Sequence, residues 1–160
     1  MSETTGTVAD ILKVAETMRQ QGKPFPTAIR EIPDVPFQSF EELLSAIRAG
    51  SVILQRFSTH FDSNIFEMVA TPFQRNLNTL LIGSAFILPV VSVVLAFVFS
   101  WWWLFGLLLF PFALGRAKRL YNRVVLSSAI SSELYFCFLY ATGQVCITTA
   151  DFEQSYYWKS

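Results

Sequence analysis

The sequence predicts a mainly α-helical membrane protein, in which a two-helix transmembrane hairpin separates a small N-terminal helical flank from a C-terminal flank with a candidate β-hairpin. Of the 160 residues, 52% are hydrophobic and 15% are charged, against about 25% charged residues in typical soluble domains. No charge lies between Arg75 and Arg116. A freely soluble monomer, a disordered chain and a nucleic-acid-binding domain driven by net charge are therefore excluded.

This charge distribution divides the chain into three parts. Residues 1–75 form the N-terminal flank, residues 76–119 the transmembrane hairpin and residues 120–160 the C-terminal flank. Either flank alone is a marginal folding unit, because a small domain buries little of its surface. We therefore expect the flanks to pack together, on the membrane or on a partner.

The uncharged stretch Thr79–Leu114 is too long for one straight membrane span. A single helix over it would be about 54 Å long, whereas the hydrocarbon core of a bilayer is about 30 Å thick. Two spans fit, with a break at Ser100, because serine interrupts the aliphatic run and the indole rings after it prefer the headgroup level. The residues expected at the membrane interface are Trp101, Trp102 and Trp103.

The second arm of this hairpin is short. It covers Trp101–Gly115, and it crosses a bilayer only if the basic residues after it extend the helix and reach back to the headgroups. Pro89 and Pro111 lie inside the two arms, where each proline frees a backbone carbonyl. A re-entrant or monotopic hairpin is the alternative to two full spans.

A cluster of basic residues follows the second arm: Arg116, Lys118, Arg119 and Arg123. Basic residues resist translocation, so the cluster predicts that both flanks and both termini are cytoplasmic. The first 30 residues contain no apolar run of signal-peptide length, so no signal peptide is expected. In a continuous helix the three arginines share a face. They are candidates for contact with a lipid headgroup or an acidic partner, beside a simple role in topology.

The N-terminal flank is expected to contain two amphipathic helices. The first covers about residues 8–21, with Thr7 as its N-cap. The second covers about residues 39–49, where Ser39 and Glu42 form a capping-box pattern before an apolar stripe. A glycine directly after each helix is expected to end it. The four prolines between the helices prevent a helix there.

A third helix is a further candidate over residues 57–71, although Val52-Ile53-Leu54 also fits the start of a strand. Its apolar stripe directly precedes a membrane span, which favours a helix lying in the membrane interface or against a partner. A core helix packed on the second helix is equally expected. The residues of this face are Phe57, Phe61, Ile65 and Met68.

The C-terminal flank leaves three alternatives open for residues 134–150. The apolar run Leu134–Tyr140, a turn-like segment and the β-branched run Val145–Thr149 together fit a β-hairpin. The same residues also fit a helix packed on the others. A third membrane span is a poorer fit, because it would contain several hydroxyls, a glutamine and a central glycine.

No residue pattern indicates chemistry. His60 is the only histidine, and the spacing of Cys137 and Cys146 matches no zinc or redox motif. No nucleophile motif and no phosphate-binding loop is present. We therefore expect no enzyme, no cofactor and no metal.

The remaining functions involve interaction or structure. The first is an accessory or regulatory subunit that docks its cytoplasmic helices on a larger membrane assembly, since unburied apolar stripes on small flanks need a partner. The alternative is a membrane-shaping or membrane-anchored scaffold protein with a short hairpin and an interfacial helix. The expected partners are the lipid bilayer and either another protein or further copies of the chain, with no nucleic acid.

Overall fold

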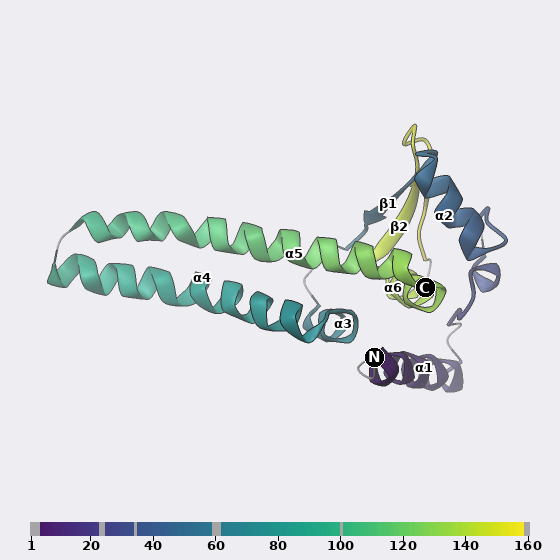
Figure 1. Ribbon diagram of the computed structural model, residues 1–160, viewed down its shortest axis with the longest axis horizontal. Helices are drawn as coiled ribbons and strands as arrows, with labels where there is room; N and C mark the ends of the chain where they lie inside the picture. The colour runs from purple at the N-terminus through teal and green to yellow at the C-terminus, as the bar shows by residue number, and fades with distance from the viewer. Residues whose placement is uncertain (1–3, 23–24, 34, 59–61, 100, 159–160) are drawn as a thin grey trace. The chain divides into compact units, whose positions relative to one another are not determined.

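The computed structural model describes residues 4–22, 25–33, 35–58, 62–99 and 101–158. Within these ranges the chain is mainly helical, with six α-helices and one small antiparallel sheet (Figure 1). The proline-rich segment contains the short 3₁₀ helix η1 (Ile29–Glu31), so the expectation of no helix there is wrong. It divides into two compact units. The flank domain consists of Met1–Val69 together with Val124–Ser160, and the hairpin unit is Ala70–Arg123.

Helix α1 (Thr4–Gln20) is the first helix of the N-terminal flank. It begins before Thr7, so the expectation that Thr7 is the N-cap is wrong. The helix extends past Gly6, because a glycine inside a helix costs only about 1 kcal/mol relative to alanine. Gly22 has a φ of 73° and follows the end of the helix. Ile11 lies on the buried face of α1.

Helix α2 (Phe40–Arg48) has the expected cap. The Ser39 Oγ accepts a hydrogen bond from the Glu42 N–H at 3.2 Å. The Glu42 carboxylate in turn accepts from the Gln38 N–H at 2.8 Å, one residue earlier than in a standard capping box. Gly50, with a φ of 73°, follows the helix. The cap was predictable because every group in it lies within a few residues.

Strand β1 (Val52–Arg56) confirms the alternative that Val52-Ile53-Leu54 begins a strand, and it ends directly before the candidate helix 57–71. Phe57 continues the strand, since its N–H donates to the carbonyl of Gln144 at 3.0 Å. The expected single helical stripe from Phe57 to Met68 is therefore wrong. The reason is tertiary, because pairing with a distant strand outweighs a local helical pattern.

Helix α3 (Ser63–Val69) is the part of that candidate helix that forms. The Asp62 carboxylate accepts hydrogen bonds from the N–H groups of Asn64 at 3.0 Å and Ile65 at 3.2 Å. Asp62 therefore satisfies the open N–H groups at this helix terminus, and the helix begins directly after it.

The C-terminal flank contains helix α6 (Glu133–Ala141) followed by strands β2 (Val145–Thr149) and β3 (Ser155–Tyr156). Leu134–Tyr140 is thus helical, and the expected hairpin between it and β2 is wrong. Side chains from 136 to 140 are all buried, so the run shows no alternation. The packed-helix alternative applies here. A third span is contradicted, because α6 and β2 are separate elements too short to cross a bilayer.

The sheet joins the two flanks, with strand order β1-β2-β3 and antiparallel pairing throughout. Val52 pairs with Thr149, and Arg56 pairs with Val145. A β-hairpin is present in the C-terminal flank, but β2 and β3 form it. The pairing of β1 with β2 makes one folded domain out of two sequence-distant segments.

The core of the flank domain also draws on both flanks. The rings of Phe25 and Phe138 lie 6.2 Å apart, and those of Phe40 and Phe136 lie 6.1 Å apart. These contacts realise the expectation that two marginal flanks pack together. The largest side chains that are almost fully buried in this domain are Ile11, Ile29, Leu43, Phe136, Phe138, Leu139, Tyr140 and Ile147.

The hairpin unit begins with helix α4 (Pro72–Val98), which is capped by Thr71 in a capping box with Gln74. The 3₁₀ helix η2 (Trp101–Leu108) and helix α5 (Leu109–Ser131) follow, and α5 continues into the flank domain. Figure 1 shows α4 and α5 side by side. Within the described residues, α4 is the one helix long and apolar enough to cross a membrane.

The second arm contains no single helix that is long and apolar enough to cross a membrane within the described residues. Its first eight residues are wound as the 3₁₀ helix η2, and α5 reaches Arg116 after only seven uncharged residues. A two-span hairpin therefore remains a proposal.

Candidate membrane interface

The outer surface of α4 is apolar and uncovered. Only 11% of its most apolar 18-residue window is buried. Monomeric soluble proteins rarely expose contiguous apolar patches of more than a few hundred Å². Such a surface is compatible with contact to lipid. Large exposed side chains on α4 include Leu80, Phe86, Ile87, Val90, Val94, Phe97 and Val98.

Small residues are prominent among the buried residues of the hairpin unit, beside Asn78 and Tyr121. Ala85 and Ser92 are buried on α4, while Ala113 and Ala117 are buried on α5. Small residues allow the backbones of membrane helices to approach closely. Gly83, another candidate for close approach, has open space around it.

The two arms have similar lengths when the winding of η2 is included. A 3₁₀ helix rises about 2.0 Å per residue, so its eight residues cover about 16 Å. With the α-helical residues up to Gly115, the arm measures about 26 Å. Thr79–Val98 on α4 measures about 30 Å. The ring centroids of Phe86 and Phe110 lie 6.5 Å apart across the hairpin. With the same rise per residue in each kind of helix, each of the two residues lies about 20 Å along its arm from the turn.

Aromatic side chains gather after the turn between the arms. Trp101 and Trp102 are exposed, and their rings stack at a centroid distance of 4.7 Å. The ring of Phe105 lies 5.5 Å from that of Trp102. The side chain of Trp103 lies outside those the structure describes. Exposed indole rings at the end of an apolar hairpin fit the headgroup level of a bilayer.

The opposite end of the hairpin carries the basic collar, which we define as Arg116, Lys118, Arg119 and Arg123. All four side chains are exposed. The guanidinium of Arg116 lies over the ring of Phe112, 4.9 Å from its centroid, in a cation–π contact. The ion pair between Arg19 and Glu31 does not involve the collar.

The expected apolar face of Phe57, Phe61, Ile65 and Met68 is not a single face. Phe57 is exposed and stacks on Tyr157, with ring centroids 5.3 Å apart and planes 6° apart. Ile65 is buried in the flank domain, and Met68 is half-buried. Phe61 lies outside the described residues, as does His60.

The turn between β2 and β3 is a feature that the sequence reasoning missed. Phe152 has a φ of 61° and is 64% exposed. The Thr149 hydroxyl donates to the Asp151 carboxylate, and this bond is the largest cause that lowers the pKa of Asp151. The Thr149 Oγ1 also accepts from the Gln154 N–H at 3.1 Å. Asp151 was the available signal, since aspartate favours turns.

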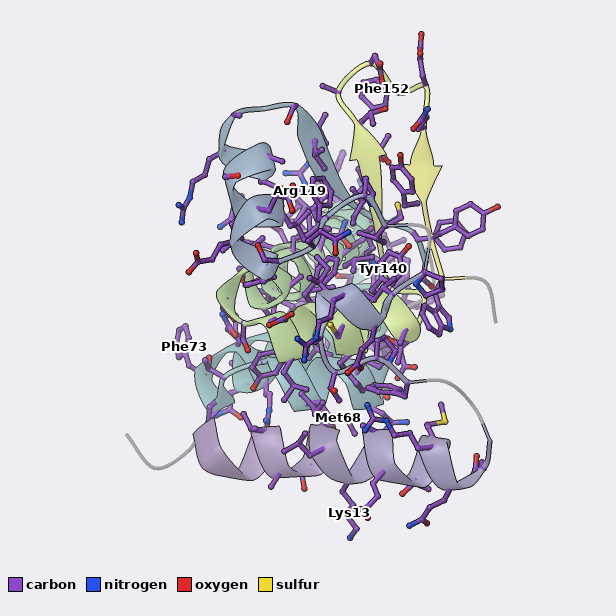
Figure 2. All side chains as sticks on the ribbon, turned by 90° about the vertical axis from the view of Figure 1, so that its right-hand side faces the viewer. Lys13, Met68, Phe73, Arg119, Tyr140 and Phe152 are labelled. Atoms are coloured by element: carbon purple, nitrogen blue, oxygen red, sulfur yellow. The ribbon has the colours of Figure 1, made fainter. Side chains whose placement is uncertain are left out.

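This turn presents an aromatic ring at one extremity of the flank domain. Figure 2 shows Phe152 at the tip of the strand connection, while Lys13 points outward from α1 on the opposite side. A bulky residue at positive φ is strained, and such strain is found at sites of interaction. Asp151 and Glu153 flank Phe152 in the sequence.

The thiols of the flank domain are protected from chemistry. Burial, followed by the charges of Glu133 and Glu31, raises the pKa of Cys137 to about 12. Burial also raises the pKa of Cys146. Among the described residues, no three His, Cys, Asp or Glu side chains gather in a way that could hold a metal ion.

Fold and site define a coarse class: a mainly helical protein with a small sheet and one helix able to cross a membrane by length and composition. Comparison of the chain with protein-family models, curated proteins and solved structures found no match.

Proposed function

We propose that the protein is an integral membrane protein anchored by a two-span hairpin, with α4 as the first span and η2 with α5 as the second. The pairing of β1 with β2 is the observation that carries this proposal. Residues before and after the hairpin unit fold into one domain, so both flanks lie on one side of the membrane. If α4 crosses the bilayer, the chain must therefore return between residues 99 and 123.

The length of the second arm supports this return. An α-helix over Trp101–Gly115 would reach only about 22 Å, whereas the 3₁₀ winding of η2 extends the arm to about 26 Å. The remaining few ångströms to a hydrocarbon core of about 30 Å lie within the reach of a snorkelling arginine. Arg116 is the first charged side chain after this arm, and reaching the headgroups takes its guanidinium off the Phe112 ring.

The basic collar supports a cytoplasmic location of the flank domain. Its four cations resist translocation, and the turn side of the hairpin carries no charge. On this proposal both termini are cytoplasmic, and the aromatic turn lies at the far interface.

We infer that the flank domain acts as an accessory or regulatory subunit that docks on a larger membrane assembly. The Phe152 ring is exposed on a turn that is held by hydrogen bonds of the Thr149 hydroxyl. This supports the docking role, because aromatic anchors presented by rigid elements make effective contacts with partners. The membrane-shaping alternative relied on an interfacial helix with Phe57 and Ile65. Phe57 follows a strand and Ile65 is buried, so the docking role has better support.

Labelling of single cysteines with a membrane-impermeant maleimide on intact cells tests the topology. Cysteines are placed at Lys13 and Glu153 in the flank domain and at Trp101 in the turn, with the buried native thiols replaced by alanine. We expect labelling at residue 101 only. Labelling at 13 and 153 alone would reverse the orientation. Unequal labelling at 13 and 153, or release of the protein by alkaline carbonate, would refute the two-span anchor.

Purification in mild detergent tests the docking role. We expect a partner protein at fixed stoichiometry, retained by the full chain and lost in Phe152→Gly. Leu12→Gln, which alters another exposed apolar residue of the flank domain, is the matched control and should keep the partner. A self-oligomer that deforms vesicles of pure lipid would instead support the membrane-shaping alternative.

A further inference from the structure

We propose that one face of α5, formed by Phe112, Arg116 and Arg119, binds the phosphate of an anionic phospholipid headgroup. This inference rests on the proposed two-span anchor and adds a specific ligand class to it. It follows from the absence of acidic residues in the hairpin unit, from the azimuth of the side chains on α5 and from their depth along the hairpin.

The hairpin unit carries cations without any internal counter-charge. Between Ala70 and Arg123 the sequence contains no aspartate and no glutamate. The side chains of the basic collar are exposed, and none takes part in an ion pair within the described part of the chain. The hairpin unit leaves these cations to dissolved counter-ions or to an external anionic ligand. At the edge of a bilayer, the phosphate layer supplies such a ligand continuously.

The angular positions of the side chains around the axis of α5 show which cations lie on the same face. At 100° per residue, Phe112, Arg116, Arg119 and Arg123 all lie within an arc of about 60° on α5. Lys118 lies about 200° from Arg116, on another side of the helix. The shared face changes from apolar to cationic between Phe112 and Arg116. This change is the pattern expected where one lipid passes from acyl chain to headgroup.

These cations differ in their depth along the membrane normal, and this depth decides which of them can reach lipid phosphates. The polar layer on each side of the hydrocarbon core is about 5–7 Å thick. With Arg116 at its inner edge, Arg119 lies about 4.5 Å further out and Arg123 about 10.5 Å further out. By backbone rise alone, Arg116 and Arg119 lie within the layer of lipid phosphates, whereas the backbone of Arg123 lies beyond its outer edge. The Arg116 guanidinium lies over the ring of Phe112, one helical turn nearer the hairpin turn, and pairing with a phosphate draws it outward from that ring.

Arginine is suited to this ligand. Its guanidinium can donate two parallel hydrogen bonds to a phosphate, and it is more weakly hydrated than the ammonium of lysine. An acidic protein could also pair with arginines, but the apolar ring of Phe112 beside Arg116 is 60% exposed and fits an acyl chain. The geometry therefore favours a lipid over a protein surface.

Electron paramagnetic resonance of spin-labelled lipids tests this proposal on the full chain in phosphatidylcholine vesicles. The readout is the association constant of labelled phosphatidylglycerol relative to labelled phosphatidylcholine. We expect a clear preference for phosphatidylglycerol. Arg116→Gln and Arg119→Gln should each reduce it by up to about fivefold, the value for one basic residue near a charged surface. Arg123→Gln should reduce it less.

The matched control removes equal charge elsewhere. Lys13→Gln with Arg30→Gln takes two exposed cations from the flank domain and should leave the preference unchanged. Addition of inorganic phosphate should act no differently from chloride at equal ionic strength, because the ligand is a lipid. Competition specific to free phosphate would overturn the lipid assignment.

Two outcomes separate this inference from the proposal on which it rests. If the protein stays in the vesicles through alkaline extraction but shows no preference, or keeps it in the Arg116→Gln/Arg119→Gln variant, the lipid site is refuted and the anchor stands. If the protein is extracted, the anchor itself fails and the lipid site fails with it.

Discussion

The side chain of Glu133 links the two flanks through one hydrogen bond. Substitution of Glu133 therefore tests quantitatively whether the two flanks fold as one domain. The Glu133 Oε1 atom accepts from the N–H of Ile29 at 2.8 Å, across 104 positions of sequence. Ile29 opens the 3₁₀ helix η1 (Ile29–Glu31) and is almost fully buried. Its N–H belongs to the helix start and has no partner within that helix.

The expected cost follows from this geometry. Hydrogen bonds to charged groups contribute about 1.5–3 kcal/mol, and an unsatisfied buried N–H costs about 1–3 kcal/mol. Glu133 also lies in the first turn of α6, where a negative charge adds about 0.3–1 kcal/mol. Partial exposure reduces these values, so we expect Glu133→Ala to lower the free energy of unfolding by about 2 kcal/mol.

Glu133→Gln separates the two contributions. The amide oxygen still accepts from Ile29, but a neutral acceptor makes a bond about half as strong, so we expect a loss of about 1 kcal/mol. Both variants lose the charge at the helix start. The difference between them therefore measures the hydrogen bond itself.

The assay is a maleimide pulse across a urea series on the full chain in detergent, read by mass spectrometry. Cys137 and Cys146 are both buried in the flank domain, so labelling reports the unfolding of that domain. Glu153→Ala removes an exposed carboxylate and should stay within about 0.5 kcal/mol of the unchanged chain. If Ala and Gln at position 133 had equal effects, or matched the control, the proposed joint between the flanks would be refuted.

Three further predictions use other local features. Ser39→Ala should lower the stability of the flank domain by about 1 kcal/mol through loss of the α2 cap, and an unchanged urea midpoint would contradict this. Phe152→Gly should relieve the positive φ and keep or raise stability by up to about 1 kcal/mol, while a lower midpoint would show that the ring is structural. Cys137 should resist maleimide at pH 8 in the folded chain, because its pKa is raised to about 12. As the unfolded thiol ionises near 9, stability should fall as pH rises between these values, and rapid labelling without urea would contradict the burial.

Some features that depend on neighbouring residues were predictable from the sequence, although the N-cap expected at Thr7 was wrong. The cap of α2 involves Ser39 and Glu42, which lie three positions apart. The apolar hairpin follows from an uncharged stretch that no small domain could bury. The basic collar and the tryptophans could be assigned to its two ends for the same reason.

Features that depend on distant residues could not be predicted from the sequence. β1 exists because it pairs with β2, which lies about ninety positions later, and this pairing left only α3 of the candidate helix. Leu134–Tyr140 has no periodicity that distinguishes strand from helix, and burial on every side in α6 decided for the helix.

By itself, the sequence determined where the apolar segment lies, where it breaks and which residues cap α2, because hydropathy and capping act over short stretches of chain. Only the tertiary structure decided that the two flanks form one domain. Strand pairing and core packing depend on which distant segments meet, and that choice is made by the burial of both together. The even number of membrane crossings that we propose follows from this shared domain.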